Sequence, residues 1–97
     1  MSKQPPVCLE IYITENCFGC KDTLELAEEL RNEFPSVVIE LIELHKAGKR
    51  RRAEIFATPT YVLDGETVSL GNPDLREIRD QLRAAQSIHK KNSVAQD

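Results

Sequence analysis

Two apolar segments rich in β-branched residues, at positions 7–14 and 37–44, lie on either side of one amphipathic segment. Both apolar segments have the length and composition of β-strands. Between them, apolar side chains recur at helical spacing: Leu24, Ala27, Leu30 and Phe34. Pro35 ends that helix, because a proline disfavours helical geometry in the residue before it. A strand, a helix and a strand in this order predict two parallel strands joined by a right-handed crossover.

The second half of the chain predicts a β-hairpin and a final helix. Residues 61–63 and 67–70 have strand composition, and Asp64-Gly65 between them is typical of a tight two-residue turn. Asn72 is expected to cap the final helix, with Pro73 at its first position. The core-facing stripe of that helix consists of Leu75, Ile78, Leu82 and Ala85.

A further short helix is expected after Gly48, where the pattern is ambiguous. The complete order is then β-α-β-α-β-β-α, an α/β fold with a four-stranded mixed sheet and helices on both faces. The length of 97 residues suits a single domain. We expect that domain at residues 7–86, after a disordered lead at 1–6 and before a frayed or disordered polar tail at 87–97.

Charge and hydropathy exclude several classes of protein. The chain has 13 Lys+Arg and 16 Asp+Glu, a net charge of −3, whereas nucleic-acid-binding domains are usually basic. No apolar run approaches the roughly 18 residues that cross a bilayer, and the first residues lack the apolar core of a secretory signal. We therefore expect a cytoplasmic monomer that binds neither nucleic acid nor membrane.

Two of the three cysteines, Cys17 and Cys20, are separated by Phe18-Gly19 at the predicted junction of the first strand and the first helix. The first amides of a helix lack intrahelical partners, and the helix dipole adds positive potential there. Both effects favour a thiolate, so the pKa of Cys17 is expected to be lowered. Cys17 is the expected nucleophile, and Cys20 is expected to resolve the mixed disulfide.

The same spacing has other interpretations. A single C-x-x-C is also half of a zinc site, for which Cys8, His45 and His89 are the remaining candidate ligands. The two thiols can also be inert. Cys8, in the middle of the first strand, is expected to be a small buried hydrophobic residue rather than a third redox group.

The arrangement resembles the thioredoxin superfamily in its minimal, glutaredoxin-like form. The resemblance rests on Cys17-Phe18-Gly19-Cys20 after the first strand, on Thr58-Pro59 before the hairpin, and on the segment that leads to the last helix. It covers roughly residues 7–86. It implies a thiol–disulfide oxidoreductase that acts on protein or small-molecule disulfides, needs no cofactor or metal, and is recycled by an unidentified reductase partner.

The resemblance also implies a cis bond between Thr58 and Pro59, packed beside the cysteines. Thr58, Pro59, Phe18 and Gly19 would then form the substrate-binding surface. From the residues alone, Pro59 can equally be an ordinary strand-opening proline.

A second resemblance is to KaiB and its thioredoxin-like relatives, through Ala57-Thr58-Pro59-Thr60 and the spacing of the last helix. It implies a protein-binding module without redox turnover. Five basic residues within positions 46–52 can form a patch for an acidic partner, but the net charge favours a solvated helix face.

Overall fold

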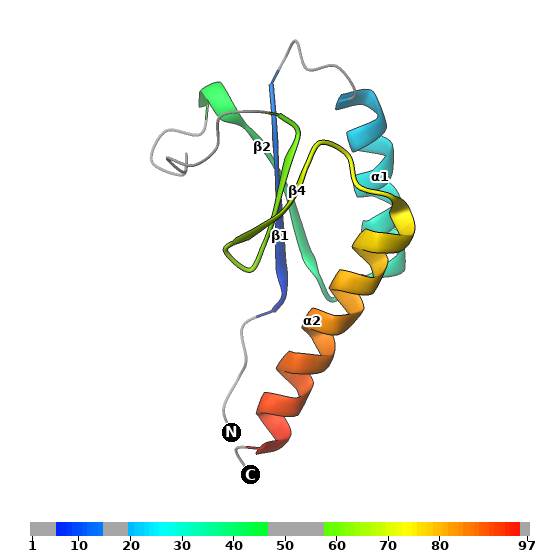
Figure 1. Ribbon diagram of the computed structural model, residues 1–97, viewed down its shortest axis with the longest axis vertical. Helices are drawn as coiled ribbons and strands as arrows, with labels where there is room; N and C mark the ends of the chain where they lie inside the picture. The colour runs from blue at the N-terminus through cyan, green and yellow to red at the C-terminus, as the bar shows by residue number, and fades with distance from the viewer. Residues whose placement is uncertain (1–5, 15–19, 47–57, 96–97) are drawn as a thin grey trace.

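The computed structural model describes residues 6–14, 20–46 and 58–95. Its centre is a four-stranded sheet in the order β2-β1-β3-β4 (Figure 1). The strands are β1 (Cys8–Ile13), β2 (Val38–Glu43), β3 (Thr60–Leu63) and β4 (Glu66–Leu70). β1 pairs with β2 in parallel and with β3 in antiparallel orientation, and β3 and β4 form an antiparallel hairpin. The predicted mixed sheet is confirmed.

Two long helices, α1 (Cys20–Glu33) and α2 (Leu75–Ala95), lie on the same face of the sheet (Figure 1). A short 3-10 helix, η1 (Leu44–Lys46), follows β2. The sequence predicts helices on both faces, but both long helices of the described chain cover one face. The helix expected after Gly48 and the basic cluster at 49–52 lie outside the described residues.

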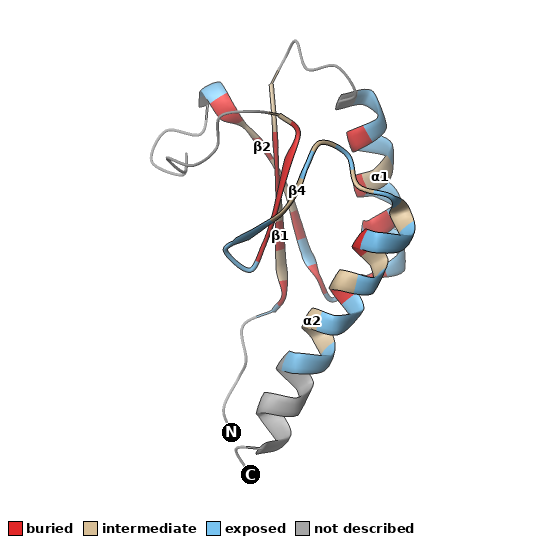
Figure 2. Ribbon diagram, in the orientation of Figure 1, coloured by how far each residue is buried: buried red, intermediate tan, exposed pale blue. Residues whose placement is uncertain are grey.

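The core under α1 and α2 contains side chains from every layer of the fold. Buried residues follow the sheet and the sheet-facing sides of the helices (Figure 2). This cluster includes Leu9 and Ile11 of β1, Tyr61 of β3, Leu30 of α1 and Leu82 of α2. Alternate side chains of a strand point to opposite faces, so a second cluster forms on the other face. That second cluster consists of Tyr12, Ile42, Leu44 and Val62.

The predicted core stripe of α1 is wrong at one position. Leu24 is 49% exposed, whereas Thr23 is fully buried and Ala27 and Leu30 follow on the same side. The helix is therefore rotated so that a hydroxyl, rather than an isobutyl group, faces the sheet. The reason is a tertiary hydrogen bond from Thr23, which the helical spacing of apolar residues does not reveal.

The hairpin has the predicted two-residue turn. Asp64 and Gly65 both have positive φ, 48° and 91°, as a type I′ turn requires. The turn is also fixed to the start of β1, because the Asp64 amide donates to the Cys8 carbonyl and the Cys8 amide donates to Asp64 Oδ1, both over 2.9 Å. The hairpin turn therefore lies at the amino end of β1.

The final helix is longer than expected. α2 continues to Ala95, through most of the region where the sequence predicts a frayed or disordered tail after residue 86. No glycine or proline interrupts residues 75–95, so nothing in the local sequence stops the helix. Among the described residues, no helix is long and apolar enough to cross a membrane.

Candidate functional site

The cysteine motif lies between the end of β1 and the start of α1. β1 ends at Ile13, Thr14 follows it, and the backbone of Cys20 opens α1. Cys17, Phe18 and Gly19 lie outside the described residues. The order of strand, cysteine motif and helix is thus the predicted one.

The Thr58–Pro59 peptide bond is cis, as the thioredoxin resemblance implies. Pro59 is buried, and its carbonyl accepts a hydrogen bond of 2.7 Å from the Gly71 amide. The hydroxyl of Thr58 lies 3.1 Å from the hydroxyl of Thr14. Thr14 stands three residues before Cys17, so the residue preceding the cis proline contacts the chain that leads into the cysteine motif.

Three polar side chains meet beneath the first turn of α1. Thr23 Oγ1 donates to Asn72 Oδ1 over 2.5 Å, and the Tyr61 hydroxyl donates to the same oxygen over 2.9 Å. Thr23 and Tyr61 are fully buried. Because a buried hydroxyl needs a partner, Asn72 stabilises the contact between α1 and β3.

The predicted capping role of Asn72 is therefore wrong. α2 begins at Leu75, and the Ile78 amide donates to the Asp74 carbonyl over 3.1 Å, which makes Asp74 the N-cap residue. Pro73 precedes the helix rather than opening it. Asn, Pro and Asp together resemble a helix start, and only the fold shows that the Asn72 amide is directed to Thr23 and Tyr61.

Burial changes the acidity of Tyr61. Desolvation raises the pKa of Tyr61 from 10.0 to about 12, although a side-chain hydrogen bond with Thr23 acts to lower this pKa. The phenol is therefore neutral at physiological pH, and it serves as a hydrogen-bond donor in this site.

Glu43, at the carboxyl end of β2, is a half-buried acid. Both of its carboxylate oxygens are buried and have no hydrogen-bond partner in the described part of the chain. Glu43 pairs in register with Ile13, the last residue of β1, so it lies at the sheet end from which the chain enters the cysteine motif. A single sequence gives no sign that both carboxylate oxygens of this glutamate are buried.

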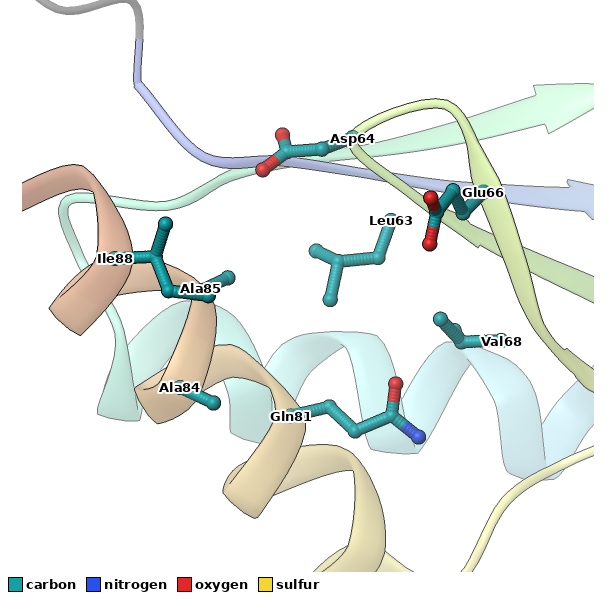
Figure 3. A pocket seen from close by; sticks show the side chains of 8 residues that line it. All are labelled: Leu63, Asp64, Glu66, Val68, Gln81, Ala84, Ala85 and Ile88. Atoms are coloured by element: carbon teal, nitrogen blue, oxygen red, sulfur yellow. The ribbon is translucent and has the colours of Figure 1, made fainter. Parts of the chain in front are cut away.

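A separate hollow lies between the hairpin and α2 (Figure 3). It has a volume of about 370 Å³; Leu63 and Val68 line it from the strands, Ala85 and Ile88 from the helix. The hairpin turn is fixed to Cys8, at the opposite end of β1 from the cysteine motif. Six strand residues separate these ends by roughly 20 Å, so this hollow is not the substrate surface of Cys17.

Cys8 and His45, two of the candidate metal ligands, do not form a metal site among the described residues. Cys8 is half-buried rather than fully buried, and its sulfur lies 3.9 Å from Glu40 Oε1. His45 is exposed in η1. Within residues 6–14, 20–46 and 58–95, no three His, Cys, Asp or Glu side chains are grouped to hold a metal ion.

Comparison with known proteins agrees with this geometry. A family profile described as thioredoxin domain matches residues 7–83, which is most of the chain. The chain belongs to the thioredoxin domain family. No curated protein matches this thioredoxin domain closely enough to count as a relative.

Solved structures show the same fold. Thioredoxin from Fasciola hepatica superposes with a TM-score of 0.64 at 20% identity, over 81% of this chain and 80% of that one. Thioredoxin O2 from Arabidopsis thaliana, in the oxidized state, gives 0.60 at 15% identity, over 81% and 74%. A chain from a study of thiol resolution in yeast mitochondrial 1-Cys peroxiredoxin gives 0.65 at 18% identity, over 84% and 81%. Neither the family match nor these structures favours the KaiB-like alternative.

Proposed function

We propose that this thioredoxin domain is a thiol–disulfide oxidoreductase whose reactive groups are Cys17 and Cys20. The observation that carries the proposal is the contact between Thr14 and Thr58. That contact brings the residue before the cis proline to the chain that enters the C-x-x-C motif. A disulfide held against Thr58 and Pro59 would therefore lie close to Cys17.

The chemistry is an exchange of two electrons between two sulfur pairs. The Cys17 thiolate attacks one sulfur of the substrate disulfide, forms a mixed disulfide and releases the other sulfur as a thiolate. The Cys20 thiolate then attacks the Cys17 sulfur and releases the second substrate thiol. The substrate is reduced, the Cys17–Cys20 pair is oxidised, and a dithiol reductant must return the pair to its starting state.

The surface beside the cis proline is suited to a protein substrate. Leu70 is 67% exposed and pairs in register with Thr60, the residue that follows Pro59. An exposed leucine next to the reactive region offers apolar contact to an extended peptide. Phe18 and Gly19 would complete this surface. The proposed substrate is a protein or small-molecule disulfide, and the proposed setting is a reducing, cytoplasmic compartment.

The experiment is reduction of insulin disulfides with a dithiol reductant, followed by turbidity. We expect activity in the full chain, its loss in Cys17→Ser, and a trapped mixed disulfide with substrate in Cys20→Ser. Cys8→Ser is the matched control and should retain activity, because Cys8 lies at the other end of β1. Absence of activity in the full chain, or wild-type activity in Cys17→Ser, overturns the proposal.

A further inference from the structure

We infer that Asn72 is a positioning residue that sets the reactivity of Cys17 by holding the first turn of α1 against β3. This role of Asn72 rests on the proposed function, in which Cys17 is the nucleophile. This role is supported by the pair of hydrogen bonds that the Asn72 side chain accepts from Thr23 and Tyr61.

Asn72 acts on the first turn of α1 through its hydrogen bond with Thr23. Thr23 follows the first helical residue, Cys20, by three positions, so it lies on the same side of the helix one turn later. The hydrogen bond of 2.5 Å to Asn72 therefore fixes the rotation of the helix end as well as its distance from the sheet.

The position of that helix end controls the thiol. The free amides and the dipole at the start of a helix favour a thiolate only when they are directed at the sulfur. A helix end that rotates or moves away offers less stabilisation to the Cys17 thiolate. The same contact accounts for the exposure of Leu24, because burying Thr23 turns its neighbour outward.

The link between β4 and α2 joins both parts of the candidate site. Gly71, at a φ of 95°, donates its amide to the carbonyl of Pro59 over 2.7 Å. The next residue, Asn72, accepts from Thr23. Two consecutive residues thus hold the cis proline and the first turn of α1, and the positive φ at position 71 allows the chain to make both contacts.

The test measures the Cys17 thiol directly. In a full-length Cys8→Ser, Cys20→Ser background, Cys17 is the single thiol, and its alkylation by iodoacetamide is followed against pH. We expect Asn72→Ala and Thr23→Val to lower the alkylation rate roughly tenfold at pH values below the thiol pKa, since less thiolate is present. Thr23→Ser keeps the donor hydroxyl and should restore the wild-type profile.

Leu82→Val is the control for a merely structural effect. Leu82 of α2 is fully buried in the core and takes no part in the contact between Asn72, Thr23 and Tyr61. We expect a lower melting temperature with an unchanged alkylation profile. A wild-type profile in folded Thr23→Val, or an equal change in Leu82→Val, overturns the inference. Because alkylation requires no turnover, this result is separate from the outcome of the insulin assay.

Discussion

The hydroxyl groups of Thr14 and Thr58 lie 3.1 Å apart, although 44 positions separate these residues in the chain. One is the first residue after β1, and the other precedes the cis proline. This contact joins the two chain segments that the proposed chemistry needs side by side.

Replacement of Thr14 by valine tests that contact. Thr14→Val keeps the branched shape and removes one hydroxyl, so we expect a loss of about 1 kcal/mol in the free energy of unfolding. We also expect several-fold slower disulfide reduction, because the entry to the cysteine motif is no longer held to Thr58. Urea denaturation and the insulin assay measure the two effects, and Thr14→Ser should resemble the wild type in both. Equal stability and rate in Thr14→Val would contradict the prediction.

The acidity of Tyr61 predicts a loss of stability at high pH. The pKa is 10.0 in the unfolded chain and about 12 in the folded one, so the unfolded state loses its proton first. Stability is therefore complete below pH 10 and declines as the pH rises towards 12, by about 2–3 kcal/mol for this group.

Denaturation of the wild type and of Tyr61→Phe across this pH range isolates the effect. The phenylalanine variant lacks the Tyr61 phenol and keeps Tyr12, so its stability should decline less steeply than that of the wild type. Parallel pH profiles for the two proteins would show that Tyr61 does not contribute.

We expect that replacement of Glu43 by an apolar residue stabilises the protein. Among the described residues, the buried carboxylate oxygens of Glu43 have no hydrogen-bond partner, and such a group opposes folding, so Glu43→Leu should raise the free energy of unfolding by roughly 1–3 kcal/mol. Glu43→Gln removes the charge but keeps buried polar atoms, and it should give a smaller gain. Chemical denaturation at neutral pH measures both variants, and a destabilised Glu43→Leu would refute the prediction.

We expect that replacement of Leu70 changes the affinity for substrate without changing the stability of the protein. Because its side chain is 67% exposed, Leu70→Ser should leave the melting temperature nearly unchanged. It should raise KM for a protein disulfide several-fold if the leucine contacts the substrate. Ile88→Ser is the matched control, since Ile88 is 56% exposed beside the distant hollow and should leave KM unchanged. Equal KM values in the two variants would remove Leu70 from the substrate surface.

Much of the fold can be predicted from the sequence because it depends on local rules. The β-branched segments, the helix between them and the Asp64-Gly65 turn each reflect backbone preference or side-chain periodicity. The parallel pairing of β1 and β2 follows from chain order and the handedness of crossovers. The cysteine motif is also evident from the sequence, because its spacing and its place before a helix are local features.

Positions that depend on contacts between distant residues could not be predicted in this way. Periodicity assigns Leu24 to the core, but the hydrogen bond from Thr23 to Asn72 turns that leucine to solvent. Local preference likewise makes Asn72 a helix cap, because its sequence neighbours do not reveal two buried hydroxyls from α1 and β3. The sequence by itself determined the order of the four strands and the two long helices. Only the tertiary structure decided which polar groups meet at the end of β1, because buried donors must find acceptors wherever the packed chain provides them.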